Sequence, residues 1–235
     1  MITNKVLILY CPFKPDQPIP NVDQVTLKGS SGQIALEETA NSSKLDILQL
    51  LGLYDIKSNN SLQARFKERF NDMSLAIISN STLAINIAIE LNCIQHSIIE
   101  STSAFVAYIN DLKVDVIFID FTDYCDNKAW KMIDELVFYY QDVFIQYIIS
   151  PPSPVIGKEE EEEEIMDIKP IQSYLIKDGT LIKSISSFLF YSSIGFNRKD
   201  TTTKYSFINN KNVILAWHLM AEIGYKLGFI QKYGT

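Results

Sequence analysis

Short apolar runs that alternate with longer helical patterns dominate the first two thirds of the chain. The residues from Val116 to Ile119 are apolar without alternation, which is typical of a strand buried on both faces. Strands separated by helical patterns at this spacing indicate crossover connections and a parallel sheet. We therefore expect an α/β fold with a mostly parallel sheet sandwiched between helices. The expected strands are Lys5–Cys11, Ser74–Ser79, Asp115–Asp120 and Val143–Ile149, and His96–Ile99 is a shorter strand candidate.

The expected helices begin at polar residues and end near glycine or a change of pattern. Asn41, Ser42 and Ser43 are suited to cap a helix that Gly52 ends. Between the first two helices, Ile34–Leu36 is only a brief apolar segment. The expected helices are Asn21–Leu27, Lys44–Leu51, Thr82–Leu91, Ala104–Leu112, Lys128–Tyr140 and a closing helix over Val213–Leu227.

The composition changes abruptly after the last of the parallel strands. Pro151–Asp167 contains three prolines and the run of six glutamates Glu159–Glu164, which predicts an exposed, disordered acidic loop. Beyond it, Tyr174–Ile182 has Asp-Gly at its centre and predicts a β-hairpin, and Phe188–Tyr191 predicts a further strand. We expect one α/β domain over residues 1–235, with the acidic loop inside it.

Charge and composition exclude several classes of protein. The net charge is −7, and outside the glutamate run 22 acidic residues nearly balance 21 basic ones, so the basic footprint of a nucleic-acid binder is missing. The sequence has no apolar stretch long enough to cross a bilayer and no lipidation signature, so we expect no membrane role. Cys11, Cys93 and Cys125 lack metal-site spacing and predict free thiols in a reducing, cytoplasmic setting.

Candidate chemistry is sought at the carboxyl ends of the strands, where α/β folds bind ligands. The sequence contains neither a dinucleotide fingerprint, nor a Walker loop, nor a nucleophile elbow. Two histidines, His96 and His218, are too few for the ligand set of a dinuclear metal site. Asp120 and Asp123 follow the strongest strand and could bind one cation, although two acids in a loop are common without one.

Several segments together resemble a known family. Ile19–Asp23, Lys28–Gly32 and Ser42–Asp55 resemble the opening of an archaeal-type cofactor-independent (2,3-bisphosphoglycerate-independent) phosphoglycerate mutase, of the alkaline phosphatase superfamily. Ser74–Cys93, Asp115–Asp126 and Val143–Val155 resemble its later strands in the same order. The resemblance implies an alkaline-phosphatase-like core. The short stretch between Asp55 and Ser74 leaves no room for the inserted capping domain of that family.

The resemblance also implies a site that has lost most of its chemistry. It puts Ser43 at the nucleophile and leaves Asp123 as the one surviving metal ligand. The family's other site residues are replaced, by Cys11 and Pro12 at the first strand, by Lys44 and Ile47 beside the nucleophile, by Cys125 and Asp126 after the central strand, and by Ser150 and Pro151 at the fourth strand.

Three hypotheses follow for the function. The leading one is a non-catalytic phosphatase-like protein, a pseudoenzyme without cofactor that binds or scaffolds a protein partner. The second is a residual phosphatase or phosphotransferase that uses Ser43, two divalent cations (zinc or manganese) and help from Asp123 or Lys44. Lys44 at a helix N-terminus could hold an anion, but a plain helix cap explains the same residues. The third is an unrelated α/β interaction module whose interface involves Ser187–Phe196 and the closing helix.

Overall fold

The computed structural model describes residues 5–37, 43–54, 59–124, 126–151, 185–195, 205 and 213–231. For residues 43–45, 126–127 and 185–188 it describes the backbone alone. The predicted hairpin Tyr174–Ile182 and the predicted acidic loop, beyond its first residue Pro151, lie outside the described residues.

The described strands form one sheet in the order β4-β3-β5-β1-β6-β7-β2-β8. All neighbouring pairs are parallel except those that involve β7, which runs antiparallel to both β6 and β2. This confirms the predicted mostly parallel sheet. The strands are β1 (Val6–Tyr10), β2 (Ser30–Glu37), β3 (Leu75–Ser79), β4 (Ile94–His96), β5 (Val116–Asp120), β6 (Ile145–Ser150), β7 (Ile185–Ile194) and β8 (Val213–Leu215).

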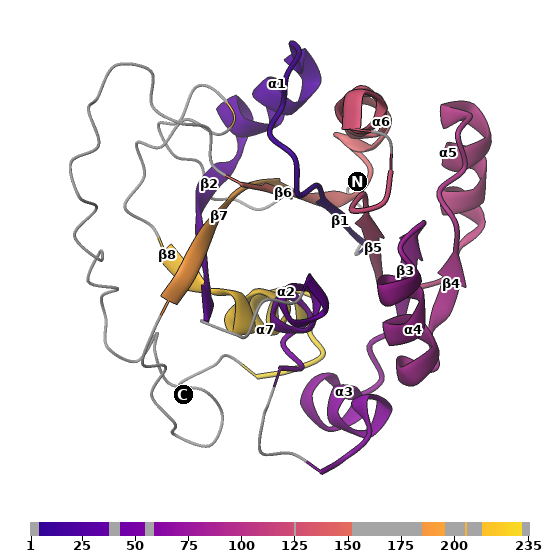
Figure 1. The fold of residues 1–235 in the computed structure, drawn as a ribbon, viewed down its shortest axis with the longest axis vertical. Coiled ribbons are helices and arrows are strands. Elements are labelled where there is room, and N and C mark those ends of the chain that lie inside the picture. Colours follow the sequence, from indigo (N-terminus) through magenta and orange to yellow (C-terminus); the bar gives the residue numbers. More distant parts are fainter. Residues whose placement is uncertain are drawn as a thin grey trace.

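Helices cover both faces of the sheet, as Figure 1 shows. α1, α5 and α6 pack on one face and α2, α3, α4 and α7 on the other, and each layer encloses its own cluster of buried residues. The helices are α1 (Pro20–Lys28), α2 (Ser43–Leu50), α3 (Leu62–Phe70), α4 (Thr82–Leu91), α5 (Thr102–Asp111), α6 (Asp126–Tyr140) and α7 (Ala216–Lys226). Among these helices, none combines the length and apolar character that crossing a bilayer requires.

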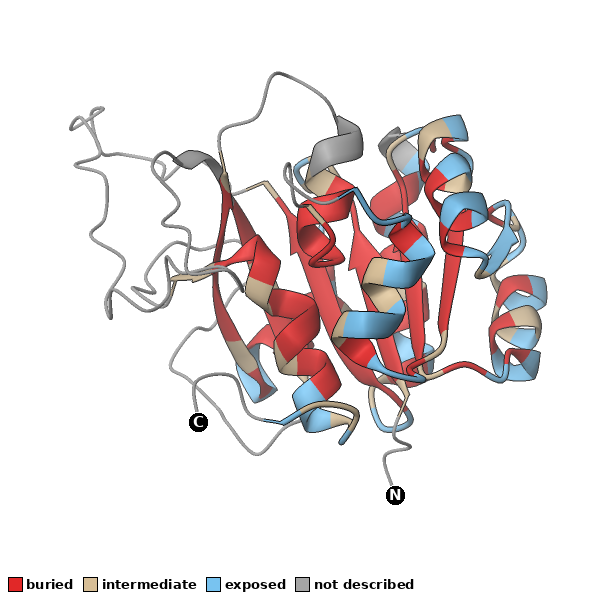
Figure 2. Cartoon of the chain, turned by 90° about the horizontal axis from the view of Figure 1, so that it is seen from below, coloured by how far each residue is buried: buried red, intermediate tan, exposed pale blue. Residues whose placement is uncertain are grey.

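Burial explains why the central strands carry no polar alternation. Every residue of β1, β3, β5 and β6 is buried, whereas all three residues of the edge strand β4 are exposed (Figure 2). Side chains of β1 alternate between the two core clusters, with Ile8 in one and Leu9 in the other. A strand that is covered on both faces favours apolar residues at nearly every position, and the sequence shows this pattern with four buried polar exceptions, Ser79, Asp120, Gln146 and Ser150.

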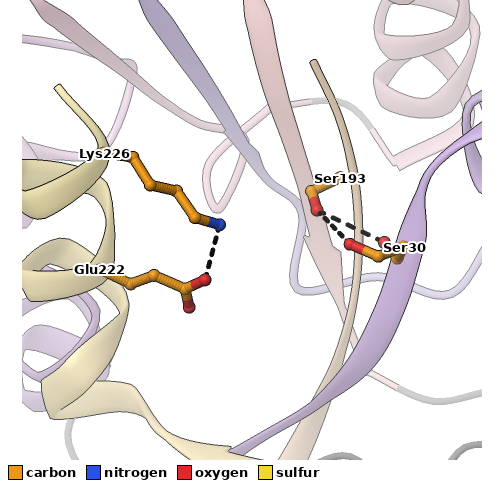
Figure 3. Close-up of polar contacts among 4 residues, drawn as sticks. All are labelled: Ser30, Ser193, Glu222 and Lys226. Carbon is orange, nitrogen blue, oxygen red and sulfur yellow. Dashed lines mark hydrogen bonds and ion pairs between the residues drawn. The ribbon is translucent and has the colours of Figure 1, made fainter. Parts of the chain in front are cut away.

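The sequence interpretation was wrong at β2, which is a full strand of eight residues rather than a brief apolar segment. Its first half, Ser30–Gln33, contains no apolar side chain larger than glycine, and its hydroxyl groups take part in hydrogen bonds. The hydroxyl of Ser30 lies 3.1 Å from that of Ser193 on β7 (Figure 3). The hydroxyl of Ser192, also on β7, donates to Thr26 of α1. Gly29, just before β2, lies so close to the Ser193 carbonyl that a Cβ would be 1.9 Å from its oxygen. Hydroxyl pairs and the close approach of Gly29 to β7 therefore hold this half of β2 in the sheet, and they leave no apolar pattern in the sequence.

The structure also differs from the sequence predictions at the closing helix, at β4 and in the stretch before β3. The closing helix α7 begins at Ala216, because the three residues before it, from Val213, form β8 and pair with β2. β4 ends at His96, where the prediction placed the start of a strand. The stretch between Asp55 and Ser74 contains α3, which the sequence analysis did not anticipate.

Two polar side chains, Asp134 and Arg69, hold the ends of α1 and α2 through long-range hydrogen bonds. The N-terminus of α1 is capped by a residue of another helix, because Asp134 of α6 accepts hydrogen bonds from the backbone N–H groups of Asn21 (2.9 Å) and Val22 (3.0 Å). The end of α2 is held by Arg69 of α3, which donates to the carbonyls of Gly52 (2.7 Å) and Trp217 (2.8 Å). The position of α2 therefore depends on α3 and α7.

Candidate functional site

The carboxyl ends of the central strands meet at one edge, which we call the carboxyl edge. In the parallel register, Tyr10 of β1 is opposite Asp120 of β5, and Asp120 is opposite Ser79 of β3. The chain leaves β3 into α4 on one face and leaves β5 into α6 on the other. Ser79 and Asp120 therefore lie at a topological switch point, the place where open α/β sheets bind ligands.

The Asp120 carboxylate is buried and already hydrogen-bonded within the chain. The Ser79 hydroxyl donates to one of its oxygens at 2.8 Å, and the backbone N–H and the hydroxyl of Thr122 both donate to the other. The Ser79 oxygen in turn accepts the N–H of Ser81, at the start of α4. Burial raises the pKa of Asp120 above its usual range, and the bonds from Thr122 and Ser79 oppose this shift. We call these residues the Asp120 network.

The first turn of α2 lies within electrostatic reach of this network. Tyr10 is buried, and its pKa is raised first by burial and then by the nearby charges of Asp46 and Asp120. Asp46 belongs to the first turn of α2, and burial raises its own pKa. α2 begins at Ser43, so the backbone of the predicted nucleophile position starts a helix near this edge.

On the opposite face of the sheet, the same edge is covered by Tyr205. The Tyr205 hydroxyl donates to the Ser150 hydroxyl oxygen at 3.1 Å, and its backbone N–H donates to Asp23 at 2.9 Å. Burial raises the pKa of Tyr205, and the nearby Cys11 thiol adds to this effect. Cys11 and Ser150 stand where the resemblance locates metal ligands, and both are fully buried. These two strand ends therefore face a tyrosine of the same chain.

The remaining predicted site residues lie apart from these contacts. Asp123 is on the exposed turn after β5, where its charge contributes to raising the pKa of Asp120. His96 is on the exposed edge strand β4, where its ring lies tilted against that of Tyr108, and His218 is half-buried on α7. The side chains of Ser43 and Lys44, and Cys125, lie outside the described part of the chain.

The described donors do not fit a pair of divalent cations. Calcium, magnesium and zinc sites need several oxygen or nitrogen ligands with free lone pairs that converge on one point. Within the described ranges, no group of three or more histidine, cysteine, aspartate or glutamate side chains is suited to hold a metal ion. Asp120, the buried acid at the switch point, directs its oxygens at hydroxyl and backbone donors instead.

Sequence analysis missed Tyr205 and undervalued Asp120. The Asp-x-Thr spacing of Asp120 and Thr122 directly after a buried strand is a signal for an Asx turn, in which an aspartate bonds the backbone two residues on. That signal favours Asp120 over Asp123 as the inward-facing acid. Tyr205 belongs to no apolar run or motif, so nothing in the sequence pattern indicates its place.

Comparison with known proteins gives matches to structures alone. No family model and no curated protein sequence matches the chain. The PH0037 protein from Pyrococcus horikoshii matches with a TM-score of 0.60 and 10% identity, covering 100% of both chains. At this identity the likeness shows a shared fold, and it does so over the whole length of both proteins.

Two further matches are partial. A cofactor-independent phosphoglycerate mutase from Thermoplasma acidophilum matches with a TM-score of 0.44 and 10% identity over 67% of this chain and 36% of the mutase. A protein in the alkaline phosphatase superfamily from Vibrio parahaemolyticus matches with a TM-score of 0.43 and 11% identity over 94% of this chain and 66% of that one. The matching structures thus include the family and the superfamily that the sequence resembles.

Proposed function

We propose that this chain is a non-catalytic protein with a phosphatase-like fold that serves in binding or scaffolding. The observation that carries the proposal is the burial of Asp120 and the way its carboxylate is hydrogen-bonded. Its carboxylate lies at the switch point, is fully buried, and accepts hydrogen bonds from Ser79 and from two donors of Thr122. A carboxylate used in this way holds β3 and β5 together rather than a cation or a substrate.

The resemblance explains why this matters for catalysis. In the superfamily that the sequence resembles, two cations lower the pKa of the serine nucleophile and stabilise the transferring phosphoryl group. The resemblance puts Cys11 and Ser150 at the positions of ligands of those cations; both are buried, and the Ser150 hydroxyl is hydrogen-bonded to Tyr205. Without the cations, the Ser43 hydroxyl keeps the weak nucleophilicity of an ordinary serine.

The test compares the purified full chain with its Ser43→Ala variant. Both are incubated with zinc or manganese and p-nitrophenyl phosphate, and the metal content of each is measured. We expect equal background rates and no stoichiometric metal in either protein. Turnover that disappears in the Ser43→Ala variant, while its thermal unfolding stays unchanged, would show that the chain is an enzyme.

A residual phosphatase or phosphotransferase is the second candidate, and the position of α2 favours it. α2 begins at Ser43, and the charge of Asp46 in its first turn reaches Tyr10 at the carboxyl edge. The free N–H groups of a helix N-terminus favour an anion such as a phosphate group. In this reading Lys44 adds a positive charge, and binding of inorganic phosphate that weakens in a Lys44→Gln variant would support it.

A further inference from the structure

Tyr205 is held by side chains from four elements that are far apart in the sequence. Asp23 of α1 binds its backbone N–H, and Ser150 of β6 binds its hydroxyl. Trp130 of α6 and Phe190 of β7 flank its ring. We call Trp130, Ser150 and Phe190, together with the nearby Cys11, the aromatic socket. The Tyr205 residue is 4% exposed within it.

The socket recognises the ring of Tyr205 through defined geometry. The Phe190 ring meets it edge to face, with centroids 5.1 Å apart and planes at 88°. The Trp130 ring is tilted by 59° at 5.5 Å, and its own position is fixed by an indole N–H that donates to the Phe13 carbonyl. Edge-to-face and tilted pairs at these distances are the favoured arrangements of aromatic rings.

The socket also recognises the hydroxyl of Tyr205 in a directional way. The Ser150 hydroxyl donates its own hydrogen to the Pro151 carbonyl, so its oxygen is left to accept a hydrogen bond. The Tyr205 hydroxyl supplies that hydrogen at 3.1 Å. An aromatic ring that lacks a hydroxyl would leave the Ser150 oxygen with its acceptor site unused.

We propose that the aromatic socket is a binding site for a phenol, and that Tyr205 is its intramolecular occupant. Cys11 follows the end of β1 and Ser150 ends β6, so two residues of the socket lie at the carboxyl edge of the parallel strands, the edge at which α/β sheets bind ligands. The socket is filled by one side chain from a distant segment, whose backbone anchor on Asp23 is separate from the contacts of its ring and hydroxyl. The ring and hydroxyl contacts are those that a free phenol would make. The inference does not depend on whether the chain is catalytic.

The test removes the occupant and offers a free one. The full-length Tyr205→Ala variant is titrated with p-cresol and with toluene, using calorimetry and thermal unfolding. We expect saturable binding of one p-cresol per chain, with an affinity about tenfold higher than that of toluene, because one hydrogen bond to Ser150 distinguishes them. The wild type and the Tyr205→Phe variant, which both keep a ring in the socket, should bind neither probe saturably.

A second variant identifies the place of binding. Adding Ser150→Ala to Tyr205→Ala should bring the affinities for p-cresol and toluene close together. The absence of saturable binding to the folded Tyr205→Ala variant, equal affinity for both probes, or equal p-cresol binding by the wild type would each overturn the proposal. If Tyr205→Ala does not fold alone, folding in p-cresol but not in toluene supports the site, and failure in both overturns it.

Discussion

The two faces of the sheet close the same carboxyl edge by different physical means. On the face covered by α2 and α4, a buried carboxylate, Asp120, is satisfied by hydroxyl and backbone donors. On the face covered by α1 and α6, the Tyr205 ring packs between Trp130 and Phe190. The stability of the first arrangement depends on the protonation state of Asp120, and the stability of the second depends on the apolar contacts of the Tyr205 ring. The comparison teaches that an edge suited to ligand binding can be occupied by the chain itself in two independent ways.

The largest expected effect is the loss of the Tyr205 ring. Tyr205→Ala should lower the free energy of unfolding by about 3 to 5 kcal/mol, because it removes a large buried side chain and leaves a cavity. Tyr205→Phe keeps the ring and should cost about 1 kcal/mol. Urea denaturation measures both. Equal losses in the two variants would mean that the hydroxyl, rather than packing, closes this face.

A smaller loss is expected when the Asp120 network is opened. Ser79→Ala removes a hydroxyl that donates to Asp120 and accepts the Ser81 N–H, and should cost about 1 to 3 kcal/mol. Ser101→Ala is a control, because Ser101 caps α5 through an exposed bond and should lose less. If the control is the more damaging change, the network does not stabilise the edge as described.

The two faces should also differ in their response to pH. Burial raises the pKa of Asp120 in the folded state, so the folded protein holds its proton to higher pH than the unfolded chain does. Its contribution to stability is therefore present below the usual pKa of aspartate and is lost as the pH rises through the raised value. The slope is at most about 1.4 kcal/mol per pH unit.

The measurement compares the wild type with Asp120→Asn in urea across the acidic pH range. The wild type should lose stability relative to the variant as the pH rises through that window. Tyr205→Phe should keep a constant difference from the wild type over the same range, since the pKa of Tyr205 is raised far from it. If the difference in free energy of unfolding between the wild type and Asp120→Asn did not change with pH, the protonation of Asp120 would not contribute to the stability of this face.

The smallest effect is expected at Asp123, the exposed acid that the resemblance matches to a metal ligand. Asp123→Ala should change the free energy of unfolding by less than about 0.5 kcal/mol, because Asp123 is on the surface. The thermal unfolding of the wild type and of Asp123→Ala is measured with and without manganese, and we expect no stabilisation of either protein by the metal. Stabilisation of the wild type by manganese that vanishes in Asp123→Ala would mean that Asp123 binds a cation.

The fold was predictable where burial alone determines the sequence pattern. The strands β1, β3 and β5 are covered on both faces, so runs such as Val116–Ile119 reveal them directly. β2 escaped recognition because its stability near Ser30 and Ser31 comes from pairing with β7 and from hydroxyl contacts. Such contacts join residues far apart in the sequence and leave no periodic signal.

The location of the candidate site, at the carboxyl ends of the strands, was predictable from the sequence, but the residues that form it were not. The four strand ends at Cys11, Ser79, Asp120 and Ser150 follow from the parallel sheet. Which of two neighbouring acids faces inward depends on the local turn, and that turn selects Asp120. The arrival of Tyr205 depends on tertiary packing alone. The roles expected for Ser43 and Lys44 stay predictions, since their side chains lie outside the described residues.

The strand order has a consequence for the order in which the sheet can assemble during synthesis. Among the described strands, β2 hydrogen-bonds to β7 and β8 alone, and their residues start at Ile185 and Val213. On the ribosome, β2 must therefore wait for two strands that are made much later than itself. The backbone groups of Ser30–Glu37 have their sheet partners only after Ile185–Ile194 and Val213–Leu215 have been made.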